Sequence, residues 1–299
     1  VPALEKLAAS DYQIVAVVSN PPQKMGRGKK IRETAIAIKA KSIGLHVIQQ
    51  QDLKSSHFKR ELEELNADLF VVVAFRILPK SLITIPKLGS INLHASLLPA
   101  YRGAAPIQWA LINGDEETGL STFFLTPKVD TGAVIFQDRL PIRPNDNYGV
   151  LSERMGNLGS DLLLKTINLI ESGSISTIKQ NHNEVTLAPK ISKDMTIIDW
   201  NKPARELHNL VRGLTLTPGA ATIIKGKRIK IQETRVDNDR DGSNYLPGEI
   251  IAIKKSIVTV QTGKGFLLIH RVQLEGKKTM DIGSFMNGFT LNIGDRFGN

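Results

Sequence analysis

The 299-residue sequence contains no cysteine, which excludes disulfide bonds, thiol nucleophiles and cysteine-ligated zinc or iron–sulfur sites. The absence of cysteine fits a reducing compartment, and we expect a cytoplasmic protein by default. The longest apolar run covers only residues 69–75, far short of the roughly 20 residues that a membrane-spanning helix needs. We therefore expect no membrane span, and the opening residues do not have the pattern of a signal segment.

Metal-binding and nucleotide-binding patterns are also missing. The six histidines are scattered, without a His-Glu-x-x-His or comparable ligand spacing, so we expect no metal site. The glycine-rich stretch at residues 26–30 lacks the Gly-x4-Gly-Lys-Ser/Thr spacing of a phosphate-binding loop. No internal repeat is present.

Acidic residues are outnumbered by basic ones, which gives a formal net charge of +10. Residues 193–299 hold 17 Lys and Arg against 11 Asp and Glu, a net charge of +6 for the C-terminal third. A basic surface of this kind favours a polyanionic partner such as a nucleic acid. The alternative is a basic surface that serves only solubility.

Residues 1–171 alternate between predicted strands and predicted helices. This alternation favours an α/β fold, with a Rossmann-like, mostly parallel sheet covered by helices on both faces. The predicted strands are residues 13–19, 68–74, 89–94, 120–126 and 133–138. The predicted helices are residues 2–10, 31–44, 57–66, 105–113 and 148–171.

The remainder of the chain has a different pattern. Residues 173–192 are polar and without periodicity, which indicates a linker between a first domain at 1–172 and a second at 193–299. After one helix at 203–213, five short β-type runs suggest a small antiparallel barrel, for which the nucleic-acid-binding OB-fold is a candidate. These runs are residues 220–224, 228–234, 248–253, 257–261 and 266–271.

The candidate active site lies in Asn92-Leu93-His94 and in Asp130-Thr131-Gly132. On a strand, Asn92 and His94 face the side opposite to Ile91 and Leu93. Ligands collect at the carboxyl ends of strands in α/β sheets, where these residues are expected. A hydrogen-bond donor, a proton carrier and a charge suit transfer of an acyl group to an amine. The alternatives are an ordinary surface histidine and a simple turn aspartate.

Two basic segments are candidates for nucleic-acid contacts. In Met25-Gly26-Arg27-Gly28-Lys29-Lys30, glycines flank a guanidinium that could enter a groove or a strand end, unless the segment is only a solvated turn. Further along, Lys227 and Arg228 lie in a predicted strand with other lysines around them. They could contact a nucleic-acid backbone, or they could protect the edge of a sheet.

Several segments together resemble the methionyl-tRNA formyltransferases over nearly the whole chain. They are PPQKMGRGKK, VVVAFRILPK, NLHASLLP with YRGAAP, VDTGAVI, ISKDMTIIDWNKPARELHNLVRG and LPGEI. The resemblance implies transfer of the formyl group of 10-formyltetrahydrofolate to the α-amino group of methionyl-initiator tRNA, for translation initiation. Folate would be a cosubstrate, no metal would take part, and we expect a monomer.

The resemblance also implies roles for individual residues. Asn92, His94 and Asp130 would be the catalytic set. The folate would pack against a loop formed by Ser96, Leu97, Leu98 and Pro99. The initiator tRNA would be bound by Arg27, Lys29, Lys30, Lys227 and Arg228, with Arg27 near the acceptor stem.

Two other functions agree with parts of the sequence. Enzymes that pass the same formyl group to water, a sugar-nucleotide amine or a purine precursor share the Asn, His and Asp arrangement. They do not combine it with the basic loop and a C-terminal barrel. A noncatalytic tRNA-binding protein would not need the three catalytic residues.

The sequence departs from the family pattern at three places. Members begin with a buried strand and a Gly-Thr-Pro turn, whereas Val1 lies inside the expected first helix. We therefore expect an N-terminally truncated sequence that folds poorly, because a missing interior strand exposes unpaired backbone groups. Arg76 stands where many of these enzymes carry glycine, and in this it resembles the purine-pathway formyltransferases. Residues 214–219 lack the tryptophan that often precedes the Pro-Gly pair in the family.

Replacement of Arg27 by alanine should raise the KM for methionyl-tRNA and leave the KM for the folate unchanged, because the guanidinium is expected to contact nucleic acid only. Steady-state kinetics with each substrate varied in turn measures both constants. Equal changes in the two would contradict this role.

Overall fold

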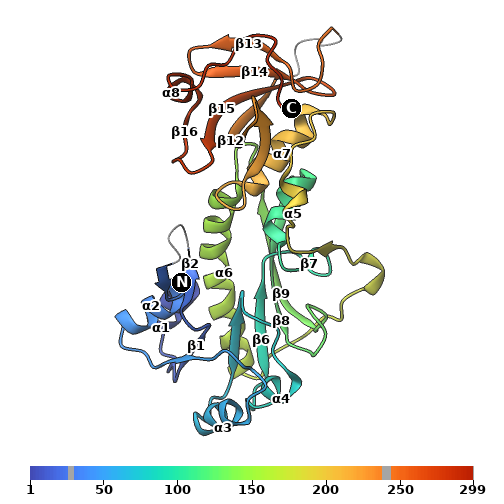
Figure 1. Ribbon diagram of the computed structural model, residues 1–299. Coiled ribbons are helices and arrows are strands. Elements are labelled where there is room, and N and C mark those ends of the chain that lie inside the picture. Colours follow the sequence, from blue (N-terminus) through green and yellow to red (C-terminus); the bar gives the residue numbers. More distant parts are fainter. Residues whose placement is uncertain (26–29, 238–243, 299) are drawn as a thin grey trace. The chain divides into compact units, whose positions relative to one another are not determined.

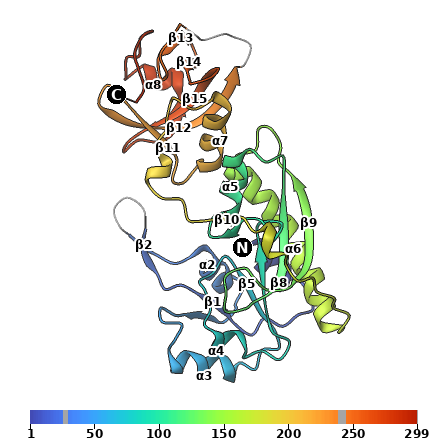
Figure 2. The same ribbon diagram turned by 90° about the vertical axis from the view of Figure 1, so that its right-hand side faces the viewer.

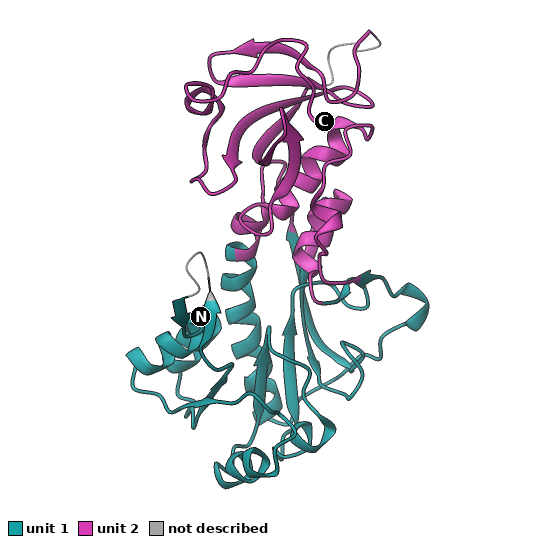
Figure 3. Cartoon of the chain, in the orientation of Figure 1, with its two compact units in different colours: residues 1–103, 119–140, 153–187 teal, residues 104–118, 141–152, 188–299 magenta. Residues whose placement is uncertain are grey.

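The computed structural model describes residues 1–25, 30–237 and 244–298, which form two compact units (Figure 3). Unit 1 comprises residues 1–103, 119–140 and 153–187, and unit 2 comprises residues 104–118, 141–152 and 188–299. Both units are therefore discontinuous along the chain. Among the described residues, no helix is long and apolar enough to cross a lipid bilayer.

Unit 1 combines helices with two main sheets and two short two-stranded ones (Figure 1). The first sheet pairs β1 (Val17–Ser19) in parallel with β4 (Val47–Gln49). The second has the order β5-β6-β8-β9, formed by β5 (Phe70–Val73), β6 (Ser90–His94), β8 (Glu117–Phe124) and β9 (Val134–Pro141). The other elements are α1 (Pro2–Ala8), β2 (Gln23–Met25), β3 (Lys30–Arg32), α2 (Ala35–Ser42), α3 (Ser56–Glu64), α4 (Lys80–Ile83), β7 (Arg102–Gly103), α6 (Tyr148–Glu171), η1 (His182–Glu184) and β10 (Leu187–Ala188).

The sheets of unit 1 differ from the single, mostly parallel sheet predicted from sequence. β5 is parallel to β6, but β6 is antiparallel to β8. Among the described strands, β1 pairs only with β4, and β5 pairs only with β6. Each of β1 and β5 thus has one edge that no described strand pairs with, and the strands form two sheets instead of one.

The local start signals of two helices explain where they begin. Thr34 accepts a hydrogen bond from the amide of Ala37 and caps α2, so the helix predicted from residue 31 starts only after β3 has ended. Ser55 caps α3 in the same way through the amide of Phe58. Satisfying an otherwise free N–H at each helix start typically contributes about 1 kcal/mol.

The long helix α6 has the predicted bounds and packs on the second sheet (Figure 1). Its buried Leu163 and Ile167 form a core cluster with Ile91 of β6 and Ile135 of β9. Burial of apolar side chains is the main stabilising term of such a layer. The same packing sets which side of β6 is left for polar residues.

Unit 2 is rich in antiparallel β-structure, as predicted. Its sheet has the order β11-β12-β15-β14-β13, and Figure 2 shows β11 beside β12. The strands are β11 (Ala220–Ile224), β12 (Lys227–Asp237), β13 (Ile250–Lys254), β14 (Ile257–Gln261), β15 (Phe266–Leu274) and the short β16 (Met280–Asp281). The helices are α5 (Pro106–Asn113), the 3-10 turn η2 (Asp194–Thr196), α7 (Ala204–Leu214) and α8 (Ile282–Met286).

Helix α7 is attached to this sheet partly through His208. Its Nδ1 lies 3.0 Å from the hydroxyl of Thr234 on β12. Burial, together with the nearby guanidinium groups of Arg212 and Arg205, lowers the pKa of His208 to about 4. The folded chain therefore favours the neutral ring down to acidic pH.

This lowered pKa predicts a pH dependence of stability. Between pH 6.5 and 4 the unfolded chain protonates His208 more readily than the folded chain does, so stability present above pH 6.5 is lost as the pH falls. The loss should be about 2 kcal/mol, after allowance for the partial exposure of the ring. Urea unfolding at several pH values should show it, and a His208→Asn variant should lack it. Identical pH slopes in the two proteins would contradict the assignment.

Candidate active site

Strand β6 carries Asn92 and His94 on the face that α6 does not cover. Ile91 belongs to the cluster with α6, and Leu93 reaches the α6 backbone at Gly159. The predicted alternation is therefore confirmed, since Asn92 and His94 must face the other side of the sheet.

The ring of His94 is held between two oxygen atoms. Its Nε2 lies 2.9 Å from the carbonyl oxygen of Tyr101, and its Nδ1 lies 3.7 Å from Oδ2 of Asp130. Because a carbonyl can only accept, Nε2 carries a hydrogen in the neutral and in the charged ring. Nδ1 is therefore the nitrogen that gains or loses the proton, and it faces the carboxylate.

Asp130 is placed by the loop between β8 and β9. Its backbone has a φ of 52°, a left-handed conformation that aspartate adopts more readily than most residues. Its Oδ2 accepts a hydrogen bond of 2.9 Å from the amide of Gly103. At Gly132 a Cβ atom would collide with the carbonyl oxygen of Phe124, which explains the glycine of the Asp-Thr-Gly sequence. The loop thus packs too closely on β8 to accept a side chain there.

Burial keeps this pair apart from bulk water. His94 is 7% exposed and Asp130 is 8% exposed. Electrostatic interactions are stronger in such surroundings than in water. The structure therefore brings together two residues that are distant in sequence.

Asn92 differs from His94 and Asp130 in that no side-chain hydrogen bond to it is seen among the described residues. It is partly exposed, but its Oδ1 is buried and makes no hydrogen bond within the described part of the chain. Buried polar atoms are nearly always paired, and an exception invites a ligand. Its amide is available to a bound molecule on the same face of β6 as His94.

Sequence reasoning missed two buried polar residues beside Asp130. Arg102 donates from Nε and Nη2 to Oε1 of Gln180, at 3.1 and 2.6 Å. Gln180 in turn donates from Nε2 to the carbonyl oxygens of Asp130 and Gly132, at 2.9 and 2.7 Å. Arg102 lies in the Tyr-Arg-Gly-Ala-Ala-Pro run, whose resemblance to the family could have pointed to a functional residue there. Gln180 lies in a polar stretch without any such motif.

The loop predicted to border the folate is held mainly by hydrogen bonds to other parts of the fold and within the loop itself. Ser96 is fully buried and donates to the carbonyl of Ala100 in the same loop. The amide of Leu98 donates to the hydroxyl of Ser121, and the carbonyl of Leu98 accepts from Gln137. The loop therefore has a defined conformation.

The side chains of this loop point in different directions. That of Leu98 packs in a cluster with Phe123, whereas Leu97 and Pro99 are partly exposed. Leu97 covers Gly119, where a Cβ atom would lie 2.5 Å from its Cδ2. A bound molecule could reach Leu97 and Pro99 more easily than Ser96 or Leu98.

Arg76, which differs from the family pattern, links two segments of unit 1. Its guanidinium donates to the carbonyl oxygens of Gln50 and Gln51 and lies over the ring of Phe75. The Nε of Arg76 is buried and has no hydrogen-bond partner among the described residues. Arg76 thus ties the end of β5 to the loop after β4.

The residues predicted to bind tRNA are only partly described. Arg27 and Lys29 lie outside the described residues, and Lys30 is exposed at the start of β3. In unit 2, Lys227 and Arg228 are adjacent and exposed at the start of β12. The structure thus presents two neighbouring cations on one strand.

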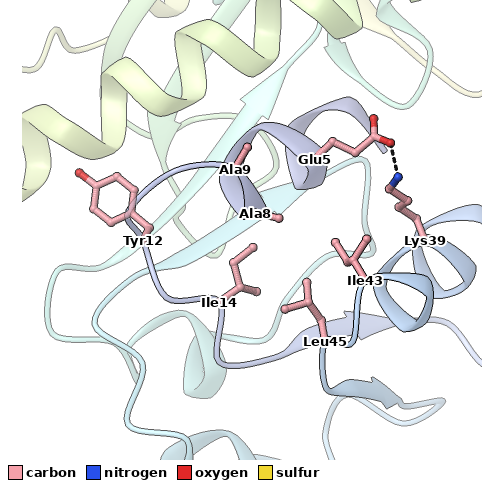
Figure 4. Close-up of a pocket in the computed structure, with 8 residues that line it drawn as sticks. All are labelled: Glu5, Ala8, Ala9, Tyr12, Ile14, Lys39, Ile43 and Leu45. Atoms are coloured by element: carbon pink, nitrogen blue, oxygen red, sulfur yellow. Dashed lines mark ion pairs between the residues drawn. The ribbon is translucent and has the colours of Figure 1, made fainter.

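The pocket drawn in Figure 4 lies elsewhere in unit 1. It has a volume of about 510 Å³, contains the ion pair between Glu5 and Lys39 (2.6 Å), and is lined by Tyr12 and Ile14 among others. None of the predicted catalytic residues lines it. The candidate active site is therefore distinct from this hollow.

Comparison with known proteins assigns a family to both parts of the chain. Residues 3–167 match the formyl transferase family, and residues 190–290 match the formyl transferase C-terminal domain. The methionyl-tRNA formyltransferase of Flavobacterium johnsoniae is 41% identical, over 97% of this chain and 92% of the relative. That of Alkaliphilus oremlandii is 40% identical, over 100% of this chain and 96% of the relative.

The chain belongs to the methionyl-tRNA formyltransferase family. The resemblance predicted from sequence is confirmed, and the chain is an enzyme. An N-formyltransferase from Helicobacter canadensis, solved with folinic acid and dTDP-3-aminofucose, has a TM-score of 0.67 at 22% identity and covers 91% of this chain and 94% of its own. At this identity the likeness shows a shared fold.

These alignments do not support the expectation of a truncated methionyl-tRNA formyltransferase. They extend over 92% and 96% of the lengths of the two relatives. Among the described strands, none pairs with both β1 and β5, so the two sheets stay separate.

Proposed function

We propose that Asn92, His94 and Asp130 transfer the formyl group of 10-formyltetrahydrofolate to the α-amino group of methionyl-initiator tRNA. The observation that carries this proposal is the buried His94–Asp130 pair, together with Asn92 on the same face of β6, whose buried Oδ1 has no hydrogen-bond partner among the described residues. The family assignment supports the reaction, and the solved relative with bound folinic acid supports a folate donor. The folate is a cosubstrate that enters and leaves in each turnover.

The amine needs little activation. An α-amino group has a reference pKa of about 7.7 to 8.0, so an appreciable fraction is neutral at neutral pH. Attack of the amine nitrogen forms a bond to the formyl carbon, whose oxygen then gains negative charge. Asn92 can donate an amide N–H to that oxygen, and one such donor typically contributes about 3 to 4 kcal/mol.

His94 and Asp130 would carry the proton from the attacking amine to the departing folate nitrogen. The carbonyl of Tyr101 holds Nε2–H, which leaves Nδ1 to exchange a proton beside the Asp130 carboxylate. The attacking nitrogen loses a proton, and the departing folate nitrogen gains one as its bond to the formyl carbon breaks. A buried histidine with a nearby carboxylate suits such a relay.

We further propose that the domains carry separate tasks. Residues 1–172 would form the Rossmann-like catalytic domain, residues 173–192 the linker, and residues 193–299 an OB-like barrel that binds tRNA. The antiparallel order of the unit 2 strands and the exposed Lys227 and Arg228 support the last assignment. Ser96, Leu97, Leu98 and Pro99 would border the folate, and Arg27, Lys29 and Lys30 would contact the tRNA.

A different acceptor remains the second candidate. The Helicobacter canadensis structure contains dTDP-3-aminofucose, so the same fold can accompany a sugar amine. The full-length relatives at about 40% identity favour methionyl-tRNA for this chain.

The purified protein should formylate methionyl-initiator tRNA when supplied with 10-formyltetrahydrofolate. Parallel reactions with a dTDP-amino sugar, or with water alone, should give little product, because the family match selects the tRNA acceptor. Chromatography of the released amino acid measures formylmethionine. Faster transfer to the amino sugar, or hydrolysis alone, would overturn the proposed acceptor.

His94→Ala and Asp130→Ala should each lower the turnover number by roughly 100-fold or more, because each removes a group from the proton relay. Binding of methionyl-tRNA should be kept. Exposed residues of the same types provide matched controls in His57→Ala and Asp11→Ala, which should behave like the wild type. Near-normal turnover in either active-site variant would refute its catalytic role.

A further inference from the structure

We propose that Gln180 is a positioning residue of the active site, and that residues 178–188, here called the strap, hold both partners of the His94 ring. The proposal rests on the function proposed above for Asn92, His94 and Asp130. It adds a role to a segment that the sequence predicted as part of a linker.

The side-chain amide of Gln180 makes four hydrogen bonds, and these allow it only one orientation. Its oxygen accepts two hydrogen bonds from Arg102, and its nitrogen donates two to the carbonyl oxygens of Asp130 and Gly132. A guanidinium can only donate and a backbone carbonyl can only accept, so a flipped amide would lose all four bonds. Gln180 and Arg102 are both buried, at 9% and 8% exposure. A satisfied buried network of this kind is rigid.

The strap also holds the other partner of His94. The hydroxyl of Thr186 accepts from the amide of Tyr101 at 2.8 Å, and the carbonyl of Thr186 accepts from the amide of Arg102 at 3.0 Å. Tyr101 is the residue whose carbonyl holds Nε2 of His94. The two sides of the imidazole are therefore fixed by one segment.

Both held residues have unfavourable backbone conformations. Tyr101 has a φ of 58° and Asp130 a φ of 52°, in the left-handed region that side chains other than glycine seldom adopt. Such conformations persist where surrounding bonds impose them. Gln180 donates one hydrogen bond to the carbonyl of Asp130, and Thr186 accepts one from the amide of Tyr101.

The strap is itself anchored at its start. Ile178 and Val134 exchange two backbone hydrogen bonds, of 2.8 and 2.9 Å. This anchor follows the Asp130 loop directly. Residues 178–188 therefore cross-link the Asp130 loop to the Tyr101 turn, although about 50 and 80 residues of sequence separate Gln180 from these segments.

The test uses three single variants of the full chain. Gln180→Ala removes all four bonds. Gln180→Glu keeps the acceptor for Arg102, but an ionised carboxylate cannot donate to the two carbonyls. Asn183→Ala is the matched control, because Asn183 is exposed in the same segment and its side chain is not part of the network.

We expect both Gln180 variants to lower kcat by on the order of 10- to 100-fold, because a small displacement of a catalytic group is costly. The KM values for methionyl-tRNA and the folate should change less than about threefold, since Gln180 bonds to Asp130 and Gly132 rather than to a substrate. Asn183→Ala should leave kcat unchanged. If Gln180→Ala does not fold, the isosteric Gln180→Glu carries the test.

A second readout is independent of turnover. The imidazole ¹⁵N resonances of His94, identified by their loss in His94→Ala, should shift in both Gln180 variants and stay in place in Asn183→Ala. Unchanged resonances together with a wild-type kcat would overturn the positioning role. Changes in KM without changes in kcat would also overturn it.

The two proposals fail in distinguishable ways. A wild-type enzyme that does not formylate methionyl-tRNA would refute the proposed function, while the His94 resonances would still report whether Gln180 positions the ring. An active wild type with unaffected Gln180 variants would refute the positioning role alone.

Discussion

The placement of the His94 ring between the Tyr101 carbonyl and the Asp130 carboxylate is the arrangement on which the site depends. The carbonyl assigns a hydrogen to Nε2, so the exchangeable proton belongs to Nδ1 beside the carboxylate. Without that carbonyl, the Asp130 carboxylate alone would favour a hydrogen on Nδ1. A single backbone oxygen thus decides which ring nitrogen would exchange a proton in the proposed reaction.

The surrounding polar network has to exist because the site is buried. A buried guanidinium such as that of Arg102 is costly unless it is paired, and Gln180 pairs it. The same amide satisfies the carbonyls of Asp130 and Gly132. Stability and catalytic geometry therefore rest on the same bonds, and a change in this network is expected to affect both.

Much of the fold follows from local signals in the sequence. Helix α6 and strands β11 and β14 have the predicted bounds, because strong periodicity or β-branched runs lie between clear turn residues. Short elements such as β4, β7 and β10 were not predicted, since two or three residues carry no period. The division of the sheet also escaped prediction, because strand pairing is a long-range property.

The active site likewise has features that the sequence predicted and features that only the structure revealed. By itself the sequence determined the family and hence the type of chemistry, because the segments around Asn92, His94 and Asp130 resemble those of the methionyl-tRNA formyltransferases. Only the tertiary structure decided which nitrogen of His94 faces Asp130, and that Gln180 and Thr186 hold this geometry. The reason is physical: hydrogen bonds between segments 50 to 80 residues apart depend on how the chain folds back on itself, and no local pattern encodes them.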